Sequence, residues 1–116
     1  MEVTRFREAK EYCPPLHHGC TALRLQGHEA SAADFAWAGL SHILPGGGAN
    51  MEAGLLGKIY IVVAGEVTVV LGDGRSETLG LYDSCFIPAG EARQVRNRSN
   101  AVASMIVVMP FPKDPE

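Results

Sequence analysis

The sequence predicts an all-β fold, a small antiparallel barrel or sandwich. Three observations lead to this expectation. Short apolar, β-branched runs recur along the chain, turns rich in glycine and proline separate them, and no amphipathic helix of a dozen residues occurs. A chain of 116 residues is long enough for a single domain that buries roughly two-thirds of its unfolded surface.

Composition divides this domain into an N-terminal arm of about residues 1–20, a core of about 21–109 and a proline-rich tail of 110–116. Mixed charges in the first half of the arm favour neither an edge strand nor a helical turn. The Pro14-Pro15 pair then requires an extended chain or a turn, because proline restricts its own backbone and that of its predecessor.

His17, His18 and Cys20 lie close together at the end of the arm and invite interpretation as metal ligands. Their spacing contains no CxxC or HxxxH pair that would fix a coordination geometry. We therefore interpret them as solvated loop side chains, with a metal site as the alternative.

Strands are expected where β-branched and aromatic residues alternate or run together. The expected strands span residues 21–25, 34–44, 59–63, 67–71, 78–82, 85–88, 94–97 and 102–109. Alternation along the second of these places Trp37, Ser41 and Ile43 on one face and His42 on the other. The Pro45-Gly46-Gly47-Gly48 run that follows is expected to break the sheet.

The runs 59–63 and 67–71 are almost entirely apolar, and the rest of the chain is organised around them. Ala64-Gly65-Glu66 separates them as a tight connection, so we expect a two-stranded ribbon. Because such strands lack a polar face, both faces of the ribbon must be covered. The barrel interior can cover one face, and a second sheet or another subunit must cover the other.

Bulk composition limits the classes of function. The net charge of −3 and the pI near 5.8 argue against a non-specific nucleic-acid binder, which is usually basic. No apolar run approaches the roughly 18 residues of a membrane helix, and the charged N-terminus does not resemble a signal peptide. Three cysteines without a CxxC pair are interpreted as reduced thiols. We expect a cytoplasmic protein with neither nucleic acid nor membrane as a partner.

Two segments resemble the cupin superfamily, in particular its small single-domain members. The first begins with PGGG at 45–48 and ends with the apolar strand and glycine of IYIVVAGE at 59–66. The second, GLYDSCFIPAGEARQVRN at 80–97, contains the Pro-x-Gly and the later asparagine of the family pattern. The resemblance covers residues 45–97 and implies a double-stranded β-helix, the jelly-roll barrel of cupins.

The resemblance also implies where a cupin metal site would lie. The positions of its three histidines and one glutamate are occupied here by Glu52, Gly54, Lys58 and Arg93. Glu52 alone could ligate a metal, since glycine has no side chain and the other two residues are cations. We therefore expect no metal and no cofactor in this pocket.

The altered site has its own chemistry. Strand parity predicts that Glu52, Lys58 and Tyr60 project into the barrel, and Arg93 should enter from a neighbouring strand. Two cations beside one carboxylate cannot remain unpaired in an apolar interior. Either Glu52 forms an internal ion pair, or the surplus charge binds a small anionic ligand through Arg93 as a bidentate clamp. Lys58 and Tyr60 are the candidate catalytic groups, because both can transfer protons.

Three functions remain open, and the sequence does not separate an enzyme from a binder. The first is a metal-independent isomerase, cyclase or lyase that acts on a small carboxylate-type metabolite. The second is a binding or sensing module that holds such an anion unchanged. The third is a metal-dependent, oxygenase-like cupin enzyme with an atypical ligand set, for example Glu52 with an inward-pointing His42 or Cys85.

A homodimer is the expected assembly. By parity, Ile59, Ile61 and Val63 point away from the pocket. Together with the apolar strand 102–109 they would leave a larger exposed patch than monomers usually tolerate. A second subunit is the expected cover for this face.

Overall fold

The computed structural model describes residues 1–112 and consists almost entirely of β-strands, so the all-β prediction is confirmed. Residues 113–116, the end of the predicted proline-rich tail, lie outside the described residues. In chain order the elements are a 3-10 turn η1 (Phe6–Glu8) and the strands β1 (Glu11–Tyr12), β2 (His17–Gln26), β3 (Trp37–Ala53), β4 (Lys58–Ala64), β5 (Val67–Leu71), β6 (Ser76–Leu79), β7 (Ser84–Ile87), β8 (Ala92–Arg96) and β9 (Ala103–Met109).

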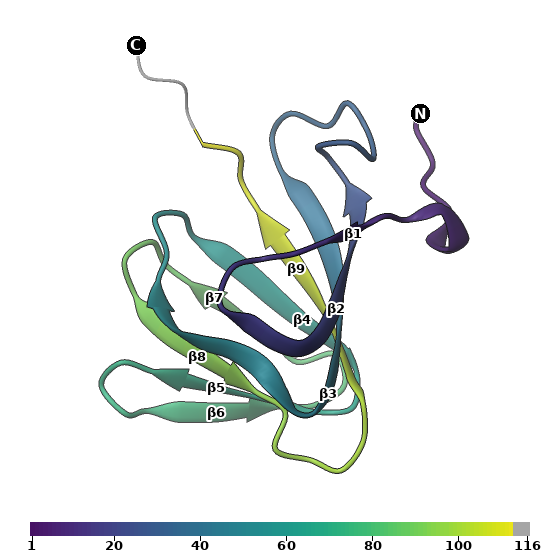
Figure 1. Ribbon diagram of the computed structural model, residues 1–116. Helices are drawn as coiled ribbons and strands as arrows, with labels where there is room; N and C mark the ends of the chain where they lie inside the picture. Colours follow the sequence, from purple (N-terminus) through teal and green to yellow (C-terminus); the bar gives the residue numbers. More distant parts are fainter. Residues whose placement is uncertain (113–116) are drawn as a thin grey trace.

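The strands pair antiparallel and form a nearly closed barrel in which one long strand, β3, belongs to both halves (Figure 1). One half has the order β6-β5-β8-β3, and the other has the order β3-β9-β4-β7. Strand β2 pairs with β3, and the short β1 pairs with β2. Apolar side chains from both halves, such as the fully buried Val62 and Val67, fill the interior. This arrangement is the predicted small jelly-roll barrel.

The Pro45–Gly48 run does not break the sheet, so this prediction is wrong. Strand β3 continues through it, pairing with β9 over residues 37–43 and with β8 over residues 48–53. Gly46 and Gly48 have φ values of 82° and 152°, which other residues rarely adopt, and they redirect the strand from one half of the barrel to the other. A local turn signal thus marks a change of pairing partner.

The two apolar runs form β4 and β5, but they do not form a ribbon with each other. Strand β4 pairs with β9 and β7, whereas β5 pairs with β6 and β8. Gly65, with a φ of 69°, turns the chain from one half of the barrel into the other. The runs are apolar because each supplies core residues to a different half.

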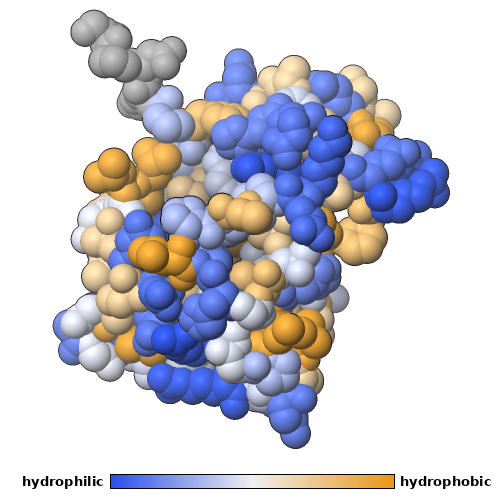
Figure 2. Space-filling model, viewed as in Figure 1, coloured by the Kyte–Doolittle hydropathy of each residue, from blue (hydrophilic) through white to orange (hydrophobic). Residues whose placement is uncertain are grey.

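The surface of the described residues is mixed in character. On the face seen in Figure 2, hydrophobic side chains form separate patches among hydrophilic ones. Within residues 1–112, no helix has the length and apolar character needed to span a membrane. All three cysteines lie in this described part of the chain, and none of them forms a disulfide.

Candidate functional site

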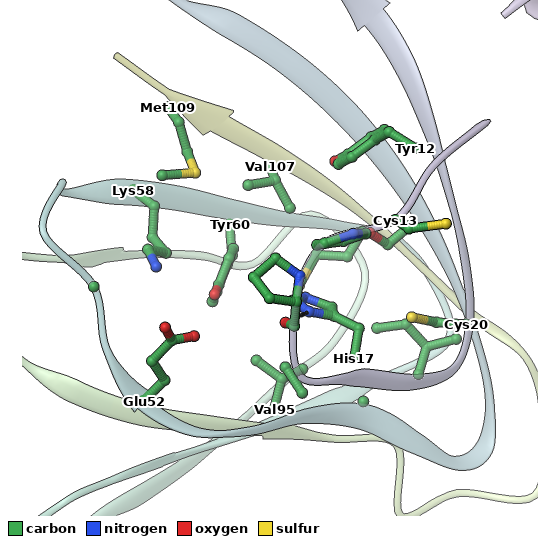
Figure 3. Close-up of a pocket in the computed structure, with 18 of the residues that line it drawn as sticks. Tyr12, Cys13, His17, Cys20, Glu52, Lys58, Tyr60, Val95, Val107 and Met109 are labelled. Carbon is green, nitrogen blue, oxygen red and sulfur yellow. Dashed lines mark hydrogen bonds between the residues drawn. The ribbon is translucent and has the colours of Figure 1, made fainter. Parts of the chain in front are cut away.

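The barrel contains a cavity of about 460 Å³, a volume suited to one small organic ligand. Strands β3, β4, β8 and β9 form most of its walls, and the N-terminal arm, including Tyr12 to Pro15, closes another side. In Figure 1 this arm crosses the barrel before it enters β2. Figure 3 shows Glu52, Lys58 and Tyr60 pointing toward one another at one end of the cavity.

All four predicted site residues line this cavity. Lys58 and Tyr60 on β4 are 8% and 3% exposed, and Arg93 on β8 is 4% exposed. Glu52 lies directly opposite Arg93 in the β3–β8 pair. Because β3 ends at Ala53 and β4 begins at Lys58, the side chains of Glu52 and Lys58 converge from two strands and not along one regular strand.

Arg93 connects two walls of the cavity by hydrogen bonds. Its Nε donates to the Tyr60 hydroxyl at 2.7 Å, and its Nη1 donates to the Asn50 carbonyl oxygen at 3.2 Å. The Nε edge of the guanidinium is therefore not free to clamp a carboxylate. Nη2 makes no hydrogen bond with the described residues, so it remains available to a ligand.

The internal ion pair that the sequence allowed does not form. Within residues 1–112, the Glu52 carboxylate lies within 4.0 Å of neither the Lys58 ammonium nor the Arg93 guanidinium. The ion pairs that are present join Arg24 to Glu29 and Arg75 to Asp73 and Glu91. This end of the cavity thus carries two cations and one carboxylate, which leaves a positive excess.

The pKa values of the two proton-transfer groups, Lys58 and Tyr60, shift in opposite directions. Burial lowers the pKa of Lys58, the Arg93 cation lowers it further, and Glu52 opposes this shift. Burial raises the pKa of Tyr60, although Arg93 opposes it. Lys58 therefore loses its proton more readily than a free lysine, whereas Tyr60 keeps its own. Since the Tyr60 oxygen accepts from Arg93, its O–H remains able to donate.

His17 was predicted to be a solvated loop residue, and this prediction is wrong. It begins β2, lies half-buried and lines the cavity (Figure 3). Its Nδ1 lies 2.7 Å from the Pro15 carbonyl oxygen, which can only accept, so Nδ1 carries the proton and Nε2 is the basic nitrogen of the neutral ring. Burial lowers the pKa of His17, the hydrogen bond to Pro15 opposes this shift, and the nearby cations Arg93 and Lys58 lower the pKa further against the effect of Glu52.

Sequence reasoning also missed the aromatic part of the cavity, which Tyr12 and Trp37 line. Strand alternation had placed Trp37 on the same face as Ser41 and Ile43, and all three residues do line the cavity. That alternation was therefore a usable signal for Trp37. No local signal identifies Tyr12 or His17, because the arm reaches the cavity only through long-range folding.

His42 does not point into the cavity. It lies on the other face of β3, with Nδ1 2.9 Å from the Ser104 hydroxyl oxygen and its ring against Phe6. Cys85 does face inward, opposite Tyr60, but it lines a second cavity of about 170 Å³ and not the one that contains Glu52. The structure therefore does not assemble the alternative ligand set of Glu52 with His42 or Cys85.

The residues at the four cupin ligand positions do not fit a metal ion. They comprise one carboxylate, one glycine and two cations, and a Cβ added to Gly54 would lie 2.9 Å from the Lys58 Nζ. The lysine ammonium thus occupies the space beside this position. Among the described residues, no group of three or more His, Cys, Asp or Glu side chains could hold a metal.

Fold and sequence together define the class of this protein. The family model of the cupin domain matches residues 39–109, and the chain belongs to this family. A Mycobacterium tuberculosis protein named beta-D-galactosidase is 37% identical over 112 residues, which cover 97% of this chain and 96% of that protein.

Solved structures share the fold. The polyketide cyclase RemF from Streptomyces resistomycificus superimposes with a TM-score of 0.85 at 23% identity, over 99% of this chain and 82% of that one. An RmlC-like cupin from Shewanella frigidimarina gives 0.78 at 16% identity, over 98% and 94% of the two chains. A sugar phosphate isomerase of the cupin superfamily from Silicibacter pomeroyi gives 0.71 at 23%, over 81% and 60%. At these identities the likeness concerns the fold alone.

Proposed function

We propose that the cavity binds a small organic anion, of the carboxylate type, and transfers protons on it without a metal, as an isomerase, cyclase or lyase does. The observation that carries this proposal is the buried positive excess. Lys58 and Arg93 share one end of the cavity with a single carboxylate, Glu52, and no ion pair neutralises them within the described residues. An anionic group would correct this imbalance.

The groups of the site have complementary roles in such a reaction. Arg93 Nη2 binds the anionic group, and a charge-assisted hydrogen bond of this kind contributes roughly 1.5–3 kcal/mol. Lys58 binds the anion as a cation, and its lowered pKa enlarges the fraction of molecules in which it has released its ammonium proton to solvent. In that fraction the Lys58 amine removes a proton from a carbon next to a carbonyl, and the electron pair moves to the carbonyl oxygen. The Tyr60 hydroxyl donates to that oxygen. Return of the proton to another carbon completes an isomerisation.

Substitution of Arg93 by Met tests the anion site. Arg93→Met keeps most of the side-chain volume but removes the charge. We expect it to abolish the binding of small carboxylates such as pyruvate, measured by calorimetry. Its effect on the free energy of unfolding should stay within about 1–2 kcal/mol, because removal of an unpaired buried cation offsets the lost hydrogen bonds.

Arg96→Met is the matched control, since Arg96 lies on the same strand, faces outward and contacts His18. It should leave carboxylate binding unchanged. A loss of about 3–5 kcal/mol in Arg93→Met, with no carboxylate bound by the parent protein, would assign Arg93 a purely structural role and overturn the proposal.

Lys58→Met separates an enzyme from a binding module. We expect the parent protein to exchange the methyl protons of pyruvate for deuterium in D₂O, followed by NMR, and Lys58→Met to slow this exchange by at least about 10²-fold. Binding without exchange in the parent protein would favour the binding module. Chelator treatment should change neither exchange nor stability. A chelator-sensitive exchange would favour the metal-dependent alternative.

The name of the Mycobacterium relative suggests hydrolysis of a galactoside as a second candidate. Glycoside hydrolysis usually employs two carboxylates, and Glu52 is the one acidic side chain among the described residues that line the cavity. We expect no release of nitrophenol from 4-nitrophenyl β-D-galactoside. A release that Glu52→Gln abolishes would replace the first proposal with this one.

A further inference from the structure

The cavity has a second end, built from aromatic side chains around Arg24. The Arg24 guanidinium carbon lies 3.9 Å from the centre of the Tyr12 ring and 4.6 Å from that of Trp37. The two rings meet edge to face, with their centres 5.6 Å apart. Cation–π stacking on two rings fixes this cluster as a rigid platform. All three side chains line the same cavity as Lys58 and Arg93.

Strand register measures how far this platform lies from the charged end. Arg24 pairs with Gly39, Gly39 with Val107, and Val107 with Tyr60, so these residues form one row across four strands. Three strand spacings separate the Arg24 and Tyr60 backbones by about 14 Å. Figure 3 agrees, because Tyr12 lies on the side of the cavity away from Lys58, with Val107 between them.

The floor between the two ends carries little side-chain bulk. Gly39 has no side chain, and a Cβ at this position would collide with the Tyr12 hydroxyl. The Tyr12 side chain therefore packs directly on the Gly39 backbone. Val107 beside it is small and apolar. Ile43, Met105 and Met109 add further apolar walls. Arg24 is the charged side chain at this end, and it lies 3.6 Å from the Glu29 carboxylate and against the two rings. The space next to the platform therefore suits an apolar group.

We infer that this platform is a subsite for an apolar ring, so the preferred ligand is a ring-bearing carboxylate, and a two- or three-carbon acid such as pyruvate fills only the anion site. The inference rests on the proposed anion site, because the ring is attached to the group that Arg93 binds. A short acid would occupy only part of the 460 Å³ and would leave the aromatic end without an apolar partner. A ring on a chain of two or three carbons fills both ends.

Three probes that differ in one group each test this inference by calorimetry. 3-Phenylpropanoate has both ring and carboxylate, propanoate lacks the ring, and 3-phenylpropan-1-ol lacks the charge. We expect 3-phenylpropanoate to bind at least tenfold more tightly than either of the others. Trp37 is the single tryptophan, so its fluorescence should respond to 3-phenylpropanoate and not to propanoate.

Variants assign the gain to the platform. Tyr12→Ala removes one ring of the platform, and Trp37→Leu removes the other. Each should weaken 3-phenylpropanoate binding about tenfold and leave propanoate binding within about twofold of the parent value. Phe35→Ala is the control, since Phe35 is 83% exposed and does not line the cavity.

The outcomes separate this inference from the function on which it rests. Equal binding of propanoate and 3-phenylpropanoate, both sensitive to Arg93→Met, would overturn the ring subsite and keep the anion site. Tight binding of the alcohol that depends on Tyr12 and Trp37 but not on Arg93 would keep the ring subsite and overturn the anion site. Failure of all three probes at millimolar concentration would overturn both.

Discussion

Lys58 is a buried cation without an ion pair among the described residues, and this gives stability a particular pH dependence. Because its pKa is lowered, the unfolded chain binds the Lys58 proton more tightly than the folded protein does. The resulting cost is present below the lowered pKa and is lost as the pH rises through it toward the unfolded value of about 10.4. We expect Lys58→Met to be more stable than the parent protein near neutral pH.

The difference in free energy of unfolding between Lys58→Met and the parent protein should shrink between pH 7 and pH 10. Denaturant titrations at each pH measure this difference. Burial raises the pKa values of the Cys20 and Cys85 thiols, and this makes stability fall with rising pH, the opposite of the Lys58 effect. Because both proteins contain these thiols, their contribution cancels in the difference. Lys10→Met, at an exposed lysine, should show no such trend. A difference that stayed constant with pH would contradict the prediction.

The meeting of four side chains in one cavity could be predicted because β-strand parity and the cupin spacing are local properties of the sequence. Glu52, Lys58, Tyr60 and Arg93 all reach one cavity, as expected. Their hydrogen bonds could not be predicted, because the choice of Tyr60 and not Glu52 as the partner of Arg93 depends on side-chain directions in three dimensions. The position of His17 in the cavity could not be predicted either, because it depends on how the N-terminal arm packs on the barrel.

Strand β3 depends on Gly48 at the bend. A Cβ at this position would collide with the Val95 carbonyl of β8, and the φ of 152° is already unfavourable for other residues. We expect Gly48→Ala to lower the free energy of unfolding by about 3 kcal/mol or more, measured by denaturant titration.

Gly46 supplies the matched control in the same bend. It also has positive φ, at 82°, but a Cβ there would have no neighbour within 4 Å. Gly46→Ala should therefore cost only about 1–2 kcal/mol, the strain of the left-handed backbone. Equal losses of unfolding free energy in the two variants would show that the requirement for glycine comes from the backbone conformation and not from the contact with β8.

Existence and type of the strands could be predicted, but their partners could not. Alternating apolar residues and the glycine-rich turns between them predicted the positions of nearly all the strands of the core. The errors at Pro45–Gly48 and at the β4–β5 connection have a common origin. A glycine turn shows that the chain changes direction. Whether the next segment pairs within the same half of the barrel or with the other half depends on long-range strand pairing, which the local sequence does not show.

The outer face of β4, β7 and β9 is largely apolar, with Ser84 opposite Ile61 in β7. Ile59 lies opposite Phe86 on one side and Val108 on the other, and Ile61 lies opposite Ile106. Phe86 is 66% exposed and Ile59 is 42% exposed. We propose that this face joins two copies of the chain into a homodimer, because so extended an apolar patch is rare on monomers.

Light scattering at micromolar concentration should give twice the 12.4 kDa mass of one chain. Phe86→Asp places a charge at the centre of the proposed interface, and we expect it to weaken the dimer at least tenfold. Phe35→Asp, at an exposed residue outside the strands, should leave the mass unchanged. A monomeric parent protein would contradict the proposal.

The N-terminal arm lines the cavity but contributes little to the two halves of the barrel, so the lining of the cavity and the fold depend partly on different segments. Tyr12 and His17 border the ligand space, yet Tyr12 belongs to a two-residue strand at the periphery, and β2 has only begun at His17. The two halves of the barrel form most of the fold, and under the proposed function this arm supplies part of the selectivity. Under that proposal, exchanging residues 12–17 for another sequence should change which small molecules the cavity binds while the strand pairing of the two halves is kept, so that substitutions in one short segment would adapt the same barrel to different ligands.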